Sequence, residues 1–377
     1  MLRFKRSSLM ITAVVVAALA LVLGHEARST EQARSLLDDA RALLEPGVDR
    51  AASLFELRTV EARQLAERAI SLTTSVRDEA EALIAVTRAI DALEAGQLDE
   101  AESALPKARN AKTALGELVA LEIVRARGEL ERAQTLASTL VEQHPRDARV
   151  LLVAAQLALA LGHASEARTL SEQGLSLSPR AHALHEQRGL ALAALGERSQ
   201  AVAALAEAAK LDGHAVTPLL HLGRLLREAG DQEAALLAFV QAAERNPKES
   251  DAWLGSGLCR ADRGDLVGAR ADLEAAAELA PMNAAPLLAL GDLDARAGDL
   301  ETALRRYRTA TKLEEDDVLS WLKLGNVLLR REETTQAIDA YRRAVDLGPD
   351  VSAAHNGLGA ALSLLGETEA AREALLE

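Results

Sequence analysis

Three histidines are the residues of this chain best suited to binding a metal ion. His182 and His185 stand three residues apart, so they share one side of any helix that contains them, and His221 follows further along. Imidazole nitrogens with this spacing can ligate Zn²⁺. No carboxylate completes a ligand set in the same pattern, and the repeat described below turns His185 toward the core. The sequence therefore predicts packing or surface roles for these histidines and no metal site.

The other reactive side chains form no catalytic pattern. Cys259 is the single cysteine, which excludes an intrachain disulfide and a cysteine-based zinc site, and we expect it to be a buried structural thiol. The acidic turn Asp262–Asp265 lacks the alternating oxygen ligands of a calcium loop. The sequence contains no glycine-rich phosphate loop and no nucleophile elbow. We expect a protein that is not an enzyme and that uses no cofactor.

Small residues recur with a period of 34 residues, and this period indicates how the chain is built. Glycine takes the same place in most repeats, and Glu332 stands in phase with it in one. The glycines are Gly128, Gly162, Gly196, Gly230, Gly264, Gly298 and Gly366. An alanine follows five residues after each of these places. These alanines are Ala133, Ala167, Ala201, Ala235, Ala269, Ala303, Ala337 and Ala371.

The clearest repeat runs from Val318 to Val351. It carries Trp321, Leu324, Gly325, Leu328, Ala337, Tyr341, Ala344 and Pro349. This pattern resembles the tetratricopeptide repeat signature, W-x2-L-G-x2-Y followed by A-x3-F and a closing proline. The resemblance implies an all-α fold, a right-handed superhelical solenoid of antiparallel helix hairpins. One hairpin cannot bury its apolar side alone, so we expect the hairpins to be stabilised by stacking.

The repeat register places the array at residues 80–377. A degenerate repeat at 80–113 precedes full repeats at 114–147, 148–181, 182–215, 216–249, 250–283, 284–317 and 318–351, and a truncated repeat follows at 352–377. In each repeat we expect the glycine and the acidic residue after it to end the first helix in a tight turn. No polar cap follows the truncated repeat, so we expect its end either to be tolerated or to be covered by another chain.

The first residues predict a membrane segment. Residues 1–6 form a basic cytoplasmic n-region, and residues 7–24 are uncharged, which is the lower edge of the length of a transmembrane anchor. A cleaved signal peptide is the alternative, but no good small-residue cleavage site follows the apolar run. The basic residues before the segment predict a single-pass protein of the bacterial inner membrane with its body in the periplasm, or a periplasmic or secreted protein if the segment is removed. Residues 25–79 are expected to form a helical stalk or a degenerate hairpin.

Composition excludes some classes of partner. The formal net charge of −14 argues against nucleic-acid binding through a basic surface. The aromatic residues of the array all fall at core positions of their repeats. They are Phe239, Trp253, Tyr307, Trp321 and Tyr341. The first helices therefore lack the aromatic platforms that bind polyproline segments or unpaired bases.

By analogy with the family, positions two, five, nine, twelve and thirteen of each repeat line a concave groove formed by the first helices. In this sequence position five is repeatedly leucine, and the arginines and acidic residues at these positions nearly balance in charge. The candidate protein-binding residues are Arg125, Arg149, Leu152, Leu220, Arg224, Arg227, Leu254, Leu288, Leu322, Asn326 and Arg330. A partly apolar groove with mixed charge suits a partner helix or an extended segment. The alternative is that the leucines only complete the packing between neighbouring repeats.

These features predict a non-enzymatic, membrane-tethered scaffold for protein–protein interaction. Family members that clamp acidic chaperone tails use lysine at position five and asparagine at position nine. Only Asn326 matches that pattern here, so this partner class is disfavoured. Two alternatives stay open: an accessory or assembly factor of an envelope biogenesis, polysaccharide or secretion complex, and a scaffold that forms homo-oligomers through its C-terminal repeat.

Overall fold

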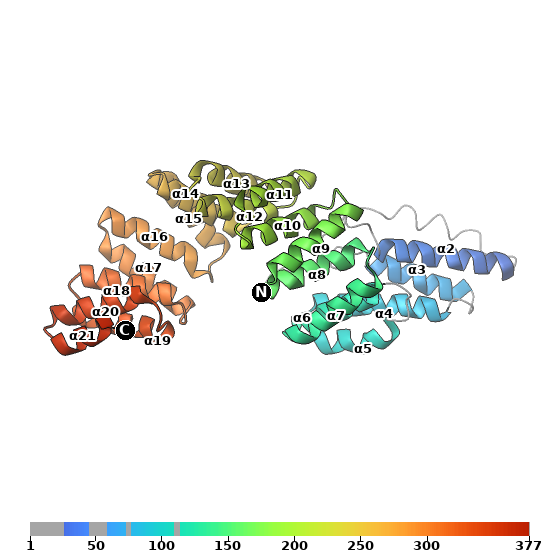
Figure 1. The fold of residues 1–377 in the computed structure, drawn as a ribbon, viewed down its shortest axis with the longest axis horizontal. Coiled ribbons are helices and arrows are strands. Elements are labelled where there is room, and N and C mark those ends of the chain that lie inside the picture. The colour runs from blue at the N-terminus through green and yellow to red at the C-terminus, as the bar shows by residue number, and fades with distance from the viewer. Residues whose placement is uncertain (1–25, 45–58, 73–76, 109–113, 377) are drawn as a thin grey trace. The chain divides into compact units, whose positions relative to one another are not determined.

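The computed structural model describes residues 26–44, 59–72, 77–108 and 114–376, and within these ranges the regular structure is twenty α-helices with no strand (Figure 1). The predicted all-α class is confirmed. The chain divides into two compact units, an N-terminal unit that ends at Leu211 and a C-terminal unit that begins at Asp212. Each unit is described by itself.

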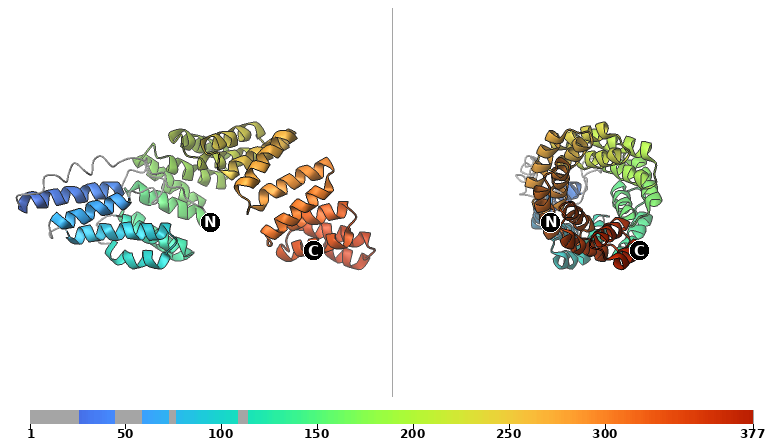
Figure 2. Two further views of the ribbon diagram at one scale, coloured as in Figure 1. Left: turned by 180° about the vertical axis from the view of Figure 1, so that it is seen from behind. Right: turned by 90° about the vertical axis from the view of Figure 1, so that its left-hand side faces the viewer.

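Consecutive helices pair into hairpins, and within each unit the hairpins follow one another in chain order (Figures 1 and 2). The described helices of the N-terminal unit are α2 (Glu26–Leu44), α3 (Thr59–Leu72), α4 (Arg77–Glu94), α5 (Leu98–Ala108), α6 (Leu115–Ala126), α7 (Leu130–Gln143), α8 (Ala148–Ala160), α9 (Ala164–Leu177), α10 (His182–Ala194) and α11 (Arg198–Leu211). Those of the C-terminal unit are α12 (Thr217–Glu228), α13 (Gln232–Arg245), α14 (Ser250–Asp262), α15 (Leu266–Leu279), α16 (Ala284–Ala297), α17 (Leu300–Leu313), α18 (Val318–Arg330), α19 (Thr334–Leu347), α20 (Ser352–Leu364) and α21 (Thr368–Leu376).

From the α4–α5 hairpin onward, a left-handed residue makes the turn inside each hairpin. Gly264 has φ +84°, and the N–H of the next residue, Asp265, donates to the carbonyl of Arg260 at 2.9 Å. This bond closes the first helix because glycine adopts the left-handed conformation without strain. The Asp265 carboxylate then caps the second helix by accepting from the Gly268 N–H at 2.9 Å. The dipeptide therefore ends one helix and begins the next, as the sequence predicts.

Large side chains from second helices fill the space beside small residues of first helices. The ring of Phe239 on α13 lies so close to Gly223 on α12 that a Cβ there would stand 2.8 Å from it. A Cβ at Gly325 on α18 would likewise stand 2.7 Å from the ring of Tyr341 on α19. Since protein interiors are close-packed, any larger residue at these glycines displaces the ring. The predicted pairing of small and large positions is present in the structure.

Ring side chains at position four link consecutive repeats. Each ring donates an N–H to the carbonyl six residues earlier, at the end of the preceding repeat. The pairs are His185 to Pro179 (2.9 Å), Trp253 to Pro247 (2.9 Å), Trp321 to Glu315 (2.8 Å) and His355 to Pro349 (2.8 Å). Both tryptophans are half-buried, whereas the sequence placed them in the core, because each indole N–H reaches a carbonyl at the surface.

None of the described helices is long and apolar enough to cross a membrane. The basic residues 1–6 and the predicted anchor at residues 7–24 lie outside the described residues. Within residues 25–79, α2 packs against α3 through a core that includes Leu37 and Leu65, and α3 packs against α4.

Candidate protein-binding surface

Hairpin stacking places the first helices of the C-terminal unit in a row. Helix α12 contacts α14, α14 contacts α16, α16 contacts α18, and α18 contacts α20. The row carries eight of the predicted binding residues: Leu220, Arg224, Arg227, Leu254, Leu288, Leu322, Asn326 and Arg330. The other three lie in the N-terminal unit, Arg125 on α6 and both Arg149 and Leu152 on α8. We call the row of α12, α14, α16 and α18 the first-helix row.

The predicted leucines divide by burial into two groups. Leu152, Leu220 and Leu288 are buried, with 4%, 8% and 7% of their surface exposed, so packing between helices already uses them. Leu254 and Leu322 are half-buried, which leaves part of each side chain at the surface. The next available apolar side chain is Leu319, at position two of its repeat and 48% exposed. The apolar part of the surface is therefore smaller than the leucine pattern predicts.

The two arginines of the N-terminal unit are held by neighbouring carboxylates. The Arg125 guanidinium lies 2.6 Å from Glu122, whose pKa is raised by burial against the opposing effect of the Arg125 charge. Arg149 lies 2.7 Å from Asp147, which also accepts from the Arg149 backbone N–H as the N-cap of α8. Burial acts to raise the pKa of Asp147, but the hydrogen bonds and charge of Arg149 outweigh it and lower that pKa. Both arginines therefore stabilise helix α6 or α8 locally.

Two arginines of the first-helix row make contacts with a neighbouring repeat. Arg224 on α12 lies 2.5 Å from Asp251 on α14. Arg330 donates to the carbonyl of Ala295 at 3.1 Å, which joins α18 to α16. Arg227 is half-buried at the end of α12. These side chains are oriented at a surface that a partner can reach.

Position nine meets the tyrosine at position twenty-four. The Asn326 amide oxygen accepts from the Tyr341 hydroxyl at 2.8 Å. In the repeat before it, the Tyr307 hydroxyl donates to Asp292 at 2.7 Å, and burial, then this carboxylate, raise the pKa of Tyr307. Position nine of these two repeats therefore presents a polar side chain, Asp292 or Asn326, whose orientation is fixed by a hydrogen bond from the tyrosine of the second helix.

A second ion pair in the first-helix row involves a residue outside the predicted set. Lys323 Nζ on α18 lies 2.8 Å from both carboxylate oxygens of Asp292 on α16. Lys323 stands at position six, which the family analogy does not assign to the groove. A signal was nevertheless present in the sequence, since Lys323 stands between two leucines, Leu322 and Leu324. Together with the Arg224–Asp251 pair, it gives the first-helix row charges of both signs.

The sequence also misses a buried charge cluster between α14 and α17. Asp294, only 3% exposed, pairs with Arg270 of α15 at 2.8 Å and with Arg306 of α17. Asp272 is 4% exposed and accepts from the Ser256 hydroxyl at 2.6 Å. Asp294 takes position eleven of its repeat, where four other repeats have Leu192, Leu226, Leu328 and Leu362. These ion pairs join consecutive helices, and both carboxylates are buried beneath their partly exposed arginine partners.

The predicted histidines and cysteine have structural surroundings. His182 is buried at the start of α10, and His185 makes the carbonyl contact described above. Burial, and then the Arg224 charge, lower the pKa of His221. Cys259 is fully buried, as predicted, and burial raises the pKa of its thiol to about 11. No group of three or more metal-ligating side chains occurs in the described part of the chain.

Comparison with known proteins identifies the repeat. A family model described as tetratricopeptide repeat matches residues 123–182, 220–284, 288–352 and 322–377, which is more than half of the chain. A comparison with curated protein sequences finds no match.

Among solved structures, the chain is similar to one in the crystal structure of the APC/C hetero-tetramer Cut9-Hcn1, with a TM-score of 0.57 and 18% identity over 89% of this chain and 73% of that chain. It is also similar to MamA, with a TM-score of 0.37 and 23% identity over 41% of this chain and 90% of that chain. A tetratricopeptide repeat protein from Parabacteroides merdae gives a TM-score of 0.49 and 16% identity over 75% of this chain and 99% of that chain. At these identities, similarity speaks for the fold alone.

Proposed function

The chain belongs to the tetratricopeptide repeat family, and we propose that it is a scaffold for protein–protein interaction that binds a partner segment along the first-helix row. Repeat arrays of this kind typically hold other proteins on extended surfaces rather than catalyse reactions. The observation that carries the proposal is the row itself, in which four contacting helices present the same repeat positions side by side.

The exposed chemistry of the row suits a helix or extended segment with alternating character. Leu254, Leu319 and Leu322 offer partial apolar surface. The Arg224–Asp251 and Asp292–Lys323 pairs place both signs of charge along it. Exposed charges contribute modestly to affinity, but they set the register and orientation of a bound segment. The row therefore supplies position and specificity to a partner and no reactive group.

A charge swap tests this proposal without removing the ion pair that joins α12 to α14. The double variant Arg224→Asp/Asp251→Arg keeps one charge of each sign at the same contact, so the thermal unfolding midpoint is expected to stay within a few degrees. In this variant the negative charge lies on α12 and the positive charge on α14, so a bound partner meets the two charges in the opposite order. We expect crosslinked pull-down from membranes to lose the partners that the parent chain captures.

The matched control is Arg342→Glu, a charge reversal at an exposed site of the second helix α19. This variant is expected to capture the same partners as the parent chain. If the swap variant and Arg342→Glu both retain every partner, the partner does not bind the first-helix row.

The tether belongs to the same proposal. Residues 7–24 carry no charged side chain, and we propose that they anchor the scaffold in the inner membrane with its body in the periplasm. A reporter joined after residue 377 is expected to be active only outside the cytoplasm. Activity in the cytoplasm alone contradicts this topology.

Self-association is a second candidate, favoured by the last described hairpin. Leu364 (69% exposed) and Leu365 (48%) are adjacent at the end of α20, and Leu375 (54%) is exposed on α21. Exposed apolar side chains that gather on one surface are typical of sites that another chain covers. Light scattering of the full chain is expected to show a species larger than the monomer, and Leu364→Lys/Leu365→Lys is expected to reduce it to the monomer. A parent chain that is monomeric at all concentrations rules this candidate out.

A further inference from the structure

A pocket of about 230 Å³ opens between α7 and the α8–α9 hairpin of the N-terminal unit. Its floor is formed by buried apolar side chains: Ala137, Ala154, Leu157, Ala158 and Leu170. Two exposed carboxylates, Glu142 on α7 and Glu166 on α9, also line it. The pocket shares no residue with the first-helix row.

At this pocket, three positions that are large in several other repeats are alanine. Position seven is Ala154, where later repeats have Leu290, Leu324 and Leu358. Position eleven is Ala158, where other repeats have Leu192, Leu328 and Leu362. Position twenty-four is Ala137, where other repeats have Phe239, Tyr307 and Tyr341. Smaller side chains at these three positions leave more room between α7 and the α8–α9 hairpin.

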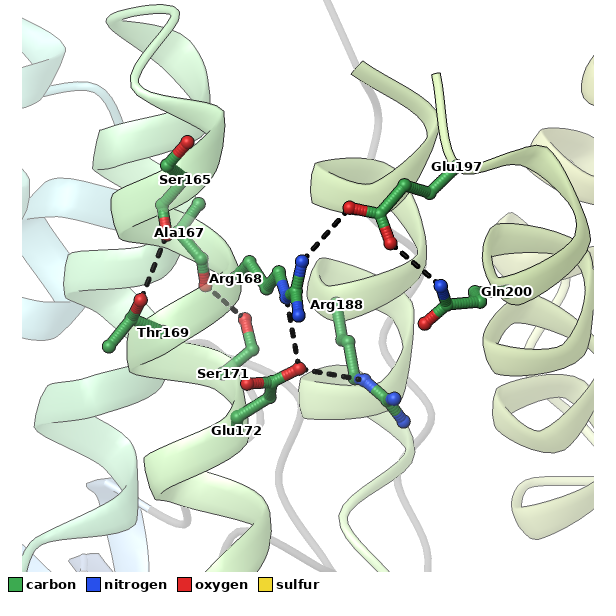
Figure 3. Close-up of polar contacts among 9 residues, drawn as sticks. All are labelled: Ser165, Ala167, Arg168, Thr169, Ser171, Glu172, Arg188, Glu197 and Gln200. Carbon is green, nitrogen blue, oxygen red and sulfur yellow. Dashed lines mark hydrogen bonds and ion pairs between the residues drawn. The ribbon is translucent and has the colours of Figure 1, made fainter. Parts of the chain in front are cut away.

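One repeat further along, between α9 and the α10–α11 hairpin, charged side chains occupy the position that corresponds to the pocket (Figure 3). Arg188 stands where the pocket has Ala154, and its Nε lies 3.6 Å from Glu172. Arg168 contacts Glu172 at 3.2 Å and Glu197 at 2.9 Å, so the ion pairs span α9 to the α10–α11 hairpin. The residues equivalent to Arg168 and Glu172 at the pocket are Gln134 and Ser138, which cannot form such a cluster. Charged side chains therefore occupy this boundary, whereas Arg308, Thr311, Lys312 and Leu324, at the corresponding repeat positions, line another pocket between α17 and α18.

Volume limits what the pocket can hold. A buried apolar cavity of about 150 Å³ accepts benzene, whereas drug-sized ligands need about 300–1,000 Å³. A pocket of about 230 Å³ therefore fits one aromatic or leucine-sized side chain. Anchoring by a single apolar side chain in a desolvated pocket is a common source of affinity at protein interfaces.

The charges at the pocket select what stands next to that anchor. Glu166 keeps half of its side chain exposed and lies 3.5 Å from His163, which is charged only when protonated. Glu142 is exposed at the end of α7. We propose that the pocket is a second protein-binding site, which takes one aromatic or leucine side chain of a partner segment with a lysine or arginine beside it.

Small aromatic probes test this site on the full-length chain. Benzylamine, benzyl alcohol and phenylacetate share one ring and differ in charge, and saturation-transfer NMR reports the affinity of each. We expect benzylamine to bind about threefold more tightly than phenylacetate, as one exposed ion pair allows. We expect Ala154→Leu to fill the pocket and weaken benzylamine binding about tenfold or more. Ala160→Leu makes the same change on an exposed face of α8 and is expected to bind like the parent chain.

Two further variants make the result decisive. Ala158→Leu fills the pocket from another position, so it repeats the test if Ala154→Leu lowers the unfolding midpoint. Glu142→Gln/Glu166→Gln is expected to remove the preference for benzylamine and to leave benzyl alcohol binding unchanged. Unchanged benzylamine binding in folded Ala154→Leu or Ala158→Leu overturns the site. Equal binding of phenylacetate and benzylamine by the parent chain overturns the basic partner.

Discussion

Replacing Glu332 with glycine is expected to stabilise the α18–α19 hairpin. Among described non-glycine residues, Glu332 alone has a positive φ, 64°, at a turn where other hairpins have glycine with φ from 73° to 85°. A side chain in this left-handed region costs about 1–2 kcal/mol. Glycine avoids that cost but loses about 0.5–1 kcal/mol more chain entropy on folding. The net stabilisation expected for Glu332→Gly is therefore about 0.5–1 kcal/mol.

Two alanine variants separate the backbone effect from the glutamate side chain. Glu332→Ala removes the carboxylate and keeps the Cβ, so it is expected to leave stability nearly unchanged. Gly298→Ala makes the reverse change at the equivalent turn, where nothing lies within 4 Å of an added Cβ. Its expected loss of about 1 kcal/mol is therefore the cost of the backbone conformation alone.

Native-state hydrogen exchange is the suitable assay, because repeat arrays can open locally and a single unfolding curve then averages over repeats. Amides of α18 and α19 are expected to exchange about two- to fivefold more slowly in Glu332→Gly, the factor that 0.5–1 kcal/mol implies. Amides of α12 and α13 serve as an internal reference. Equal slowing in Glu332→Ala and Glu332→Gly would falsify the backbone explanation, because the carboxylate would then be the cause.

The remaining predictions concern buried groups. Asp294→Ala leaves two arginines without their carboxylate and is expected to lower the free energy of unfolding by about 2–4 kcal/mol in denaturant titration. Gly223→Ala is expected to cost about 1–3 kcal/mol, because the Phe239 ring must move, and Phe239→Leu in the same chain should recover part of the loss. Burial raises the pKa of Glu186 to about 7 from 4.5, so its contribution to stability is complete below pH 4.5 and lost as the pH rises through 7; Glu186→Gln should flatten this dependence. The Cys259 thiol, with a pKa raised to about 11, should react with iodoacetamide only after unfolding.

Sequence reasoning predicted the hairpins better than the surface. The turn residues, the small positions and the rings at position twenty-four lie where the repeat register puts them, because each depends on neighbours close in the chain, whereas the tryptophans at position four are half-buried. The binding residues depend on which side chain of the next repeat stands opposite. Leu220 and Leu288 have the same residue type and position as Leu254 and Leu322, yet the first two are buried and the others are half-buried.

The repeat register did not predict which charged residues form ion pairs with one another. Lys323 stands 31 residues from Asp292, and the sequence does not show that the two side chains meet. Asp294 occupies a core position, and its charged carboxylate is stable there because guanidinium groups from two other helices pair with it. A buried carboxylate is stable only with such partners, so its role is decided by packing across repeats.

The sequence by itself determined the all-helical repeat, the hairpin turns and the family, because these follow from residue types at a fixed local period. Only the tertiary structure decided which leucines stay accessible, which charges pair between helices, and that Ala137, Ala154 and Ala158 surround one pocket. The physical reason is that burial and pairing belong to contacts between repeats. The sequence of a single repeat contains only one of the two residues that form each such contact.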